Sequence, residues 1–231
     1  MTQTKNPDIN RDFARVNPDL VREASQFQAA ILADVNGRRG AMHGRITALR
    51  PQMQCAGSAL TVDVRHGDNL MIHAAMMLAK PGDVLVIDGK ADQTAALMGT
   101  IMITACKALG IAGIVIDGAV RDSLEIDDID FPVWSVGTNP NGPTKNVPGR
   151  IGHTISCGGV TVHAGDFVLA DADGVTVIER DKLAALIPDA HKKVADEAKR
   201  IAQIKAGNVK SAWLEPALQA AGVLKEGETL E

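Results

Sequence analysis

The stretch from Gly99 to Asp122 constrains the fold more than any other part of the chain. It reads GTIMITACKALGIAGIVIDGAVRD. The pattern predicts a helix, then a turn punctuated by Gly110 and Gly113, then a buried strand with its apolar centre at residues 114–116. A helix followed by a short turn and a fully apolar strand is typical of an α/β fold with a parallel sheet.

A charged pair follows that strand. We expect Asp117-Gly118 to close the strand, so that Arg121 and Asp122 lie just beyond its C-terminal end. In open α/β sheets ligands bind outside the carboxyl ends of the strands. The pair is therefore a candidate functional site.

The chain before and after this stretch repeats the same alternation of helices and strands. We expect Asn17-Pro18-Asp19 to begin a first helix, because Pro is tolerated in the first turn and an acidic residue follows it. Asp68 or Asn69 could cap the helix that follows the first long strand, and Asp88-Gly89 should end the second. The predicted helices cover residues 18–36 and 70–79, and a short helix lies within 123–130. The predicted strands are 58–64, 84–87 and 131–136.

The C-terminal third has a different pattern. Short apolar runs with tight turns between 151 and 178 predict antiparallel strands. A charged amphipathic helix should begin at Asp181 and continue to about Lys205, broken or kinked at Pro188. A last short helix over 211–221 is interrupted by Pro216. We therefore predict one α/β domain over 1–231, with a mixed-sheet core at about 20–180 and a C-terminal helical arm at about 181–231. Such an arm could pack on a neighbouring subunit, which favours a homo-oligomer.

Composition excludes several classes of function. The net charge is −4 and aromatic residues make up 3% of the chain, so neither a basic nucleic-acid footprint nor a base-stacking platform is expected. The three cysteines are far apart, which is typical of buried thiols in a reducing compartment. The polar N-terminus lacks the apolar segment of a signal peptide, and no run of residues is apolar enough to span a bilayer. We expect a cytoplasmic protein that binds no membrane.

Two kinds of group near the central stretch could do chemistry. Asp122 could anchor Mg²⁺ or Mn²⁺, which need only one or two protein carboxylates, and Arg121 could then hold a carboxylate or an enolate oxygen. The alternative is a helix-capping Asp beside a surface Arg. Gly99 could let the backbone N–H groups of Thr100, Ile101 and Met102 face an anion, or it could serve close packing only.

Other motifs are absent. His66 and His73 have no third ligand at a recognisable spacing, so a histidine metal site is not expected. No glycine-rich nucleotide loop, no Walker lysine and no GxSxG nucleophile turn occurs.

Four segments together resemble the RraA-like family: DNLMIHAAMMLAKPGDVLVIDG, ADQTAALMGTIMITACKALGIAGIVIDGAVRD, FPVWSVGTNPNGPTKNVPG and GDFVLADADGVTVI. The resemblance covers about residues 20–205. Its enzymatic members are class II pyruvate aldolases that act on 4-hydroxy-4-methyl-2-oxoglutarate and 4-carboxy-4-hydroxy-2-oxoadipate. The resemblance implies a swivelling β/β/α fold and trimers that can pair into hexamers, with a site between subunits. It also implies a divalent metal, Mg²⁺ or Mn²⁺, and a side activity that decarboxylates oxaloacetate.

The resemblance also assigns residues. Asp122 is similar to the family's metal anchor, and Arg121 to the residue that holds the pyruvyl oxygen and stabilises the enolate. Ile101 and Met102, after Gly99, fall where backbone amides bind the pyruvyl carboxylate. Lys145 lies where a basic residue can meet the distal carboxylates.

Two further positions complete the assignment. Glu197 is at about the place of a glutamate that reaches in from the neighbouring subunit. Thr100 departs from the family, whose aldolases have Asp or Glu there to help position a water for proton transfer. A threonine hydroxyl cannot replace a carboxylate as general base. Asp92 or Glu197 could take over this work, or the aldolase activity is altered.

The preferred hypothesis is a metal-dependent lyase that cleaves a 4-hydroxy-2-oxo acid to pyruvate and a second oxo acid. The alternative is a non-catalytic regulator that binds a ribonuclease or another protein, as the family's name suggests. Arg121 and Asp122 favour the enzyme, whereas Thr100 favours the regulator or a different chemistry. A methyltransferase gains no support, because no glycine-rich cofactor loop follows a first strand.

Overall fold

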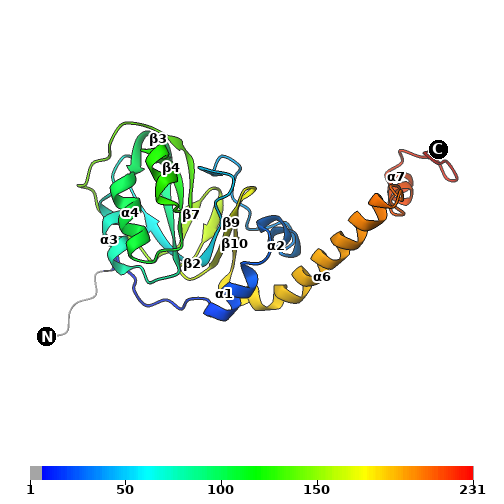
Figure 1. Cartoon of the computed structure of the whole chain (residues 1–231), viewed down its shortest axis with the longest axis horizontal. Coiled ribbons are helices and arrows are strands. Elements are labelled where there is room, and N and C mark those ends of the chain that lie inside the picture. The colour runs from blue at the N-terminus through cyan, green and yellow to red at the C-terminus, as the bar shows by residue number, and fades with distance from the viewer. Residues whose placement is uncertain (1–6, 231) are drawn as a thin grey trace. The chain divides into compact units, whose positions relative to one another are not determined.

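A mixed β-sheet forms the centre of the protein (Figure 1). The computed structural model describes residues 7–230, and within them the sheet has eight strands in the order β1-β5-β4-β3-β2-β9-β10, with β6 paired to β2. The neighbouring strands β2, β3, β4 and β5 are parallel, while β1, β6, β9 and β10 pair antiparallel. The bounds are β1 Thr47–Ala48, β2 Cys55–Asp63, β3 Asp83–Met98, β4 Gly113–Val120, β5 Val133–Thr138, β6 Arg150–Ile151, β9 Phe167–Asp171 and β10 Gly174–Ile178. A separate hairpin pairs β7 Ile155–Cys157 with β8 Val160–Val162.

Helices cover the sheet. Helices α3 and α4 lie side by side on one side of it, whereas α2 packs against β9 and β10 and α1 contacts β2 (Figure 1). The bounds are α1 Pro18–Ala24, α2 Ala29–Val35, α3 Leu70–Leu78, α4 Thr100–Ala108, α5 Ser123–Ile129, α6 Arg180–Lys205 and α7 Leu214–Ala220. This arrangement confirms the α/β fold with a mixed sheet and a long C-terminal helix.

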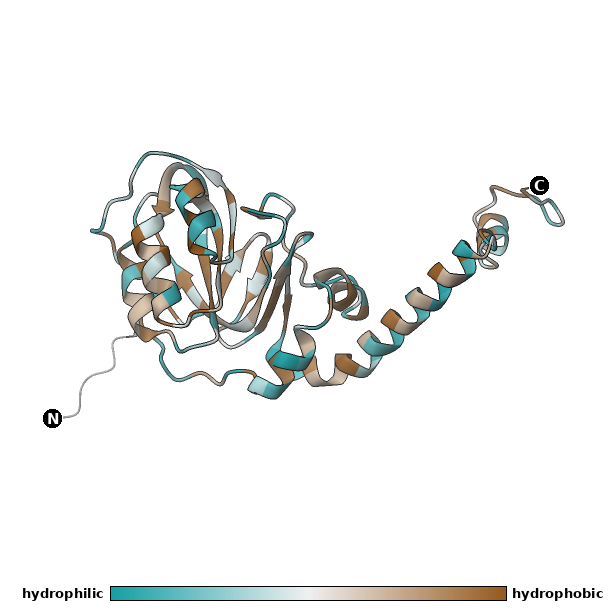
Figure 2. Ribbon diagram, viewed as in Figure 1, coloured by the Kyte–Doolittle hydropathy of each residue, from teal (hydrophilic) through white to brown (hydrophobic). Residues whose placement is uncertain are grey.

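Two apolar clusters hold the layers together. The larger one joins the parallel strands to α3 and α4, and the smaller one joins α1 and α2 to β9 and β10. Figure 2 shows the hydrophobic colour concentrated in the strands. Strand β4 is buried along its whole length, as expected for a parallel strand covered on both faces.

Two of the predicted strand ends are wrong. Asp117-Gly118 lies inside β4, and Asp88-Gly89 lies inside β3, which continues to Met98. Ion pairs allow these two aspartates to lie inside strands. Arg45 binds both carboxylate oxygens of buried Asp117, at 3.0 and 2.7 Å, and Lys90 binds Asp88. A paired aspartate can therefore remain in a buried strand.

The single helix predicted over 18–36 is two helices, α1 and α2. The helix start predicted at Asn17-Pro18-Asp19 is confirmed, and the Asn17 side chain caps α1 by accepting from the N–H of Asp19. Residues 25–28 form a turn before α2, and the N–H of Ala29 donates to Asp171 Oδ2 at 2.8 Å, which holds the start of α2 on the sheet.

The prolines do not break the C-terminal helices. Pro188 lies within the continuous helix α6, and Pro216 is the third residue of α7, where its missing N–H would have no intrahelical partner. The described residues divide into two compact units, with the boundary after Ala190. Among residues 7–230, no helix is both long and apolar enough to cross a membrane.

Candidate functional site

The site lies where β3 and β4 end. Met98 and Val120 are register partners at the last residues of these strands, and the N–H of Arg121 donates to the carbonyl of Met98 at 2.9 Å. Gly99 and Arg121 therefore leave the sheet side by side. As predicted, the Arg121-Asp122 pair directly follows a buried strand.

Asp122 has an unusual backbone. Its φ of 60° and ψ of 39° place it in the left-handed region, which few residues other than glycine adopt and which often marks a functional position. Its side chain does not cap its own helix α5. Instead, Oδ2 accepts a hydrogen bond from the N–H of Thr100 at 3.1 Å and lies 3.7 Å from Arg121 Nε. The carboxylate thus bridges the start of α4 and the guanidinium, so Asp122 does cap a helix through its side chain, and that helix is α4 instead of α5.

Gly99 is required by close approach. Its backbone is extended, so no special φ demands glycine. A Cβ there would lie 2.4 Å from Asp122 Oδ2 and 2.9 Å from Arg121 Cγ. Close packing therefore explains this glycine, and the space it leaves brings the Asp122 carboxylate onto the N-terminus of α4.

The N-terminus of α4 also faces a cavity. The first N–H groups of a helix have no intrahelical acceptor. That of Thr100 is taken by Asp122, which leaves those of Ile101 and Met102 as the next donors. Both residues line the cavity.

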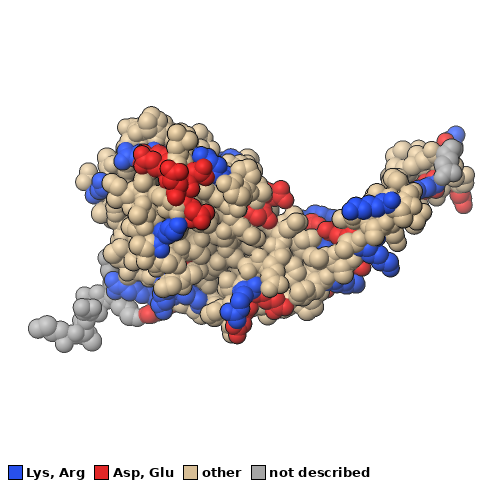
Figure 3. Space-filling view, viewed as in Figure 1, with Lys and Arg blue, Asp and Glu red and all other residues tan. Residues whose placement is uncertain are grey.

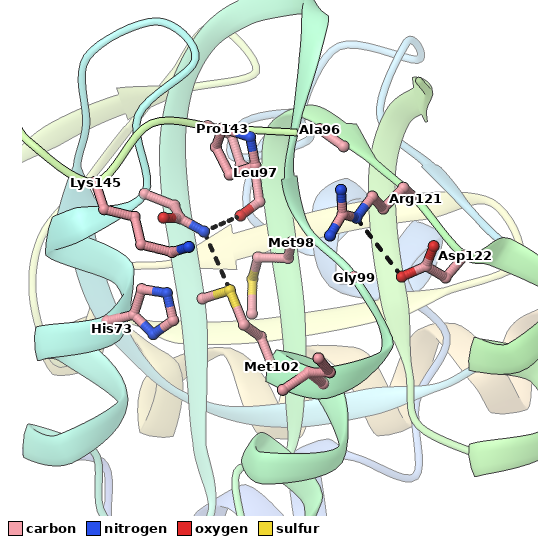
Figure 4. Close-up of a pocket in the computed structure, with 12 residues that line it drawn as sticks. His73, Ala96, Leu97, Met98, Gly99, Met102, Arg121, Asp122, Pro143 and Lys145 are labelled. Atoms are coloured by element: carbon pink, nitrogen blue, oxygen red, sulfur yellow. Dashed lines mark hydrogen bonds and ion pairs between the residues drawn. The ribbon is translucent and has the colours of Figure 1, made fainter. Parts of the chain in front are cut away.

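The cavity has two chemically distinct ends (Figure 4). It has a volume of about 140 Å³. Arg121 and Asp122 lie on one side and His73 and Lys145 on the other, with the sulfur-bearing side chain of Met98 between them. A cation and an acid at one end and a cation at the other suit a ligand with two anionic groups.

Two of the residues that line the cavity, Asn69 and His73, each have a buried polar atom without a hydrogen-bond partner in the described residues. The side chain of Asn69 donates from Nδ2 to the carbonyl of Leu97 at 2.8 Å and to Met102 Sδ at 3.2 Å, but its Oδ1 has no partner in the described residues. His73 Nε2, one helical turn further along α3, is in the same state. Burial, and then the positive charge of Lys145, lower the pKa of His73, which favours the neutral imidazole.

Buried Asp68 holds the loop that carries Lys145. Its Oδ2 accepts from the hydroxyl of Thr144 at 2.6 Å and from the N–H of Asn146 at 2.7 Å, and its Oδ1 accepts from the N–H of Leu70 at 3.0 Å. Burial alone would raise the pKa of Asp68, but these hydrogen bonds to the charged form outweigh it and lower the pKa. Of the two predicted caps of α3, Asp68 is the one whose side chain makes the bond.

Asp68→Asn is expected to reduce the free energy of unfolding at pH 7 by about 2 kcal/mol, because an amide cannot accept all of these bonds. The lowered pKa means that the carboxylate stabilises the fold above its unfolded pKa of about 3.9 and loses that effect as pH falls through the folded value. Urea unfolding at pH 7, 5 and 3 should give a difference between wild type and variant that is full at pH 7 and shrinks toward pH 3. A difference independent of pH would contradict this role.

Glu125 belongs to the site although sequence reasoning missed it. The Thr100 hydroxyl donates to Glu125 Oε2 at 2.8 Å, while the Thr100 N–H donates to Asp122. One threonine therefore connects two carboxylates from the same helix turn of α5. The available signal was the spacing, since residues three apart at a helix start share a face.

Asp92 and Glu197 lie in other surroundings. Asp92 Oδ1 accepts from the N–H and hydroxyl of Thr94, and Asp92 is not among the residues that line the cavity. Glu197 belongs to the second unit, where it pairs with Lys193 at 3.1 Å. Its part in the site stays a prediction.

The donor set fits a hard divalent ion that keeps most of its waters. The Asp122 side chain is 35% exposed, with Glu125 close by through Thr100. In the part of the chain that the structure describes, no three His, Cys, Asp or Glu side chains gather as a cage. Mg²⁺ and Mn²⁺ are commonly held by one or two carboxylates together with water and substrate oxygens, so Asp122 can serve as such an anchor.

Comparison with known proteins identifies the family that this chain matches. Residues 19–177 match the RraA-like family described as Aldolase/RraA. A protein of Halalkalibacterium halodurans named "Putative 4-hydroxy-4-methyl-2-oxoglutarate aldolase" is 44% identical over 182 residues, which are 79% of this chain and 87% of that protein.

Two solved structures have the same fold. Streptomyces coelicolor RraAS2, described as an unusual member of the RNase ES inhibitor RraA protein family, has a TM-score of 0.74 and 26% identity over 81% of this chain and 99% of its own. A Geobacillus kaustophilus protein described as an S-adenosylmethionine:2-dimethylmenaquinone methyltransferase has a TM-score of 0.63 and 33% identity over 68% of this chain and 98% of its own.

Proposed function

The chain belongs to the RraA-like family, and on that premise we propose that it is a divalent-metal-dependent aldolase. It would cleave a 4-hydroxy-2-oxo acid to pyruvate and a second oxo acid. The observation that carries the proposal is the position of the Asp122 carboxylate, which lies between the N-terminus of α4 and Arg121 at one end of a cavity with Lys145 at the other. The relative from H. halodurans, whose name is that of such an aldolase, supports the same reaction.

The pyruvyl end of the substrate would bind at the start of α4. The N–H groups of Ile101 and Met102 suit its carboxylate, because a helix N-terminus attracts anions. The Arg121 guanidinium would donate to the 2-oxo oxygen and offset the negative charge that develops there as the enolate forms. Lys145 would attract a second carboxylate at the other end of the cavity.

Asp122 would hold the metal ion, with Thr100 and Glu125 beside it. When bound, a divalent cation acts as a Lewis acid that polarises the 2-oxo group. The same arrangement would stabilise the enolate left by loss of CO₂ from oxaloacetate, so we also propose oxaloacetate decarboxylase activity. Glu125 adds negative charge beside Asp122 and positions Thr100, whose N–H in turn fixes the Asp122 carboxylate.

Glu125→Gln is therefore expected to weaken Mg²⁺ or Mn²⁺ binding about tenfold, as loss of an outer-shell partner commonly does. Isothermal titration with each metal, and the metal-induced rise in melting temperature, measure this without substrate. Asp128→Asn is the matched control, because Asp128 is an exposed acid on the same helix. Equal metal affinity in Glu125→Gln and Asp128→Asn would contradict this role for Glu125.

We also propose that copies of this chain associate with one another. Ile101, which lines the cavity, and Leu124, which follows Asp122 by two residues, are 86% and 76% exposed. Large apolar side chains exposed next to a site commonly mark a protein contact. We propose a homotrimer or homohexamer in the cytoplasm, and a monomeric mass by light scattering would contradict it.

A protein-binding regulator is the second candidate, because exposed Ile101 and Leu124 would suit a different protein as well as a second copy. Figure 3 shows acidic side chains gathered on the visible face of the first unit, with basic ones scattered around them, which does not favour direct binding of nucleic acid. A regulator of this kind needs no divalent metal. A melting temperature that responds to neither Mg²⁺ nor Mn²⁺ would favour it over the aldolase.

A further inference from the structure

We infer that His73 is the group that accepts the proton of the substrate's C4 hydroxyl during carbon–carbon cleavage. The inference rests on the proposed aldolase function and names a catalytic residue for it. Within the described residues, the titratable side chains that line the cavity are His73, Arg121, Asp122 and Lys145.

Three of these four groups are unsuited to accept the proton. Arg121 and Lys145 are cations at neutral pH and have no lone pair to offer. Asp122 accepts the Thr100 N–H, lies beside Arg121, and is the carboxylate available to a metal. Glu125 accepts the Thr100 hydroxyl and does not line the cavity. His73 is the remaining candidate.

The surroundings of His73 suit a proton acceptor. Its Nε2 is buried and has no hydrogen-bond partner in the described structure, which is costly unless a ligand supplies one. Asn69 Oδ1, one turn earlier on α3, is a second buried acceptor without a donor. In the neutral tautomer that carries its proton on Nδ1, His73 Nε2 is an acceptor like Asn69 Oδ1, and two such atoms fit a ligand group that donates a hydrogen bond, as a hydroxyl does.

The position of His73 also suits the reaction. It lies beside Lys145 and across the cavity from Arg121 and Asp122 (Figure 4). A 2-oxo acid held at Arg121 would extend its C4 toward this wall, with the C4 carboxylate near Lys145. Burial, and then the positive charge of Lys145, favour the neutral imidazole. The positive charge of Arg121 and the negative charge of Asp122 face His73 together from the other side of the cavity.

The step is balanced without any oxidant or reductant. The hydroxyl proton moves to His73 Nε2, the C4–O bond becomes a carbonyl, and the C3–C4 bond breaks. Its electron pair forms the enolate of pyruvate at C2 and C3. Protonation of C3 then gives pyruvate, and His73 returns to its neutral form when the imidazolium releases its proton.

The test compares two substrates in the His73→Gln variant of the full chain with Mg²⁺. Cleavage of 4-hydroxy-4-methyl-2-oxoglutarate requires removal of a hydroxyl proton, whereas decarboxylation of oxaloacetate does not. The variant should lose cleavage on the order of a hundredfold, because glutamine cannot take up the proton, and keep decarboxylation within about a factor of three. His66→Gln, a nearby exposed histidine that does not line the cavity, should keep both activities.

The pH profile provides a second readout. In wild type, kcat/KM for cleavage should fall as pH decreases through the pKa of His73, which lies below the usual histidine value, and this limb should be absent in His73→Gln. Unchanged cleavage in the variant, or an equal loss of both activities, would overturn the inference. Failure of wild type to release pyruvate from either substrate would instead overturn the proposed function.

Discussion

Asp122→Asn is expected to reduce metal-dependent pyruvate release on the order of a thousandfold, because it removes the one carboxylate that we place on the metal ion. Asn is the informative replacement, since it keeps the shape of the side chain and tolerates the left-handed backbone that Asp122 adopts. The amide can still face Thr100 and Arg121, but it lacks the charge that attracts a divalent cation. Steady-state assays with saturating Mg²⁺ measure the loss.

The control for Asp122→Asn is Asp128→Asn. It removes the same charge from the same short helix, at an exposed position away from the cavity. If only net charge near α5 matters, both variants should lose similar activity. Full metal-dependent turnover in Asp122→Asn would contradict the proposed mechanism.

Gly99→Ala is expected to reduce turnover on the order of a hundredfold, although alanine favours helices and Gly99 has an ordinary backbone. The new methyl carbon would lie 2.4 Å from Asp122 Oδ2 and 2.9 Å from Arg121 Cγ. Both side chains would have to move by several tenths of an ångström or more. Since Asp122 also accepts the Thr100 N–H, its displacement would disturb the metal anchor and the start of α4 together.

Gly44→Ala is the matched control for this substitution. A Cβ at Gly44 would meet nothing within 4 Å, and its φ is not in the left-handed region. It should keep wild-type kcat and melting temperature. A crystal structure of Gly99→Ala should show Asp122 shifted away from α4, and unchanged turnover in that variant would mean that the positions of Asp122 and Arg121 are not critical.

The order of helices and strands could be predicted where local pattern decides it. The apolar centre of β4 follows from periodicity, and the start of α1 follows from the preference for Pro and acidic residues in the first turn of a helix. The predicted strand ends at Asp88 and Asp117 were wrong because their partners, Lys90 and Arg45, are known only once the chain has folded. An Asp-Gly pair alone cannot distinguish a turn from a salt-bridged position in a buried strand.

Only part of the candidate site could be predicted from the sequence. Arg121, Asp122 and the start of α4 follow from a charged pair after a buried strand and from the glycine that precedes a helix. His73 and Glu125 could not be assigned, because their importance depends on contacts between segments that are distant in sequence. His73 shares the cavity with Lys145 from another loop, and Glu125 meets Thr100 from another helix.

The most direct test of the central claim is pyruvate release from 4-hydroxy-4-methyl-2-oxoglutarate, measured with Mg²⁺, with Mn²⁺ and with EDTA. We expect release with either metal and none with EDTA, and we expect oxaloacetate to be decarboxylated with the same metals. Release that is unaffected by EDTA would contradict metal dependence. No release from either substrate under any of these conditions would contradict the aldolase itself.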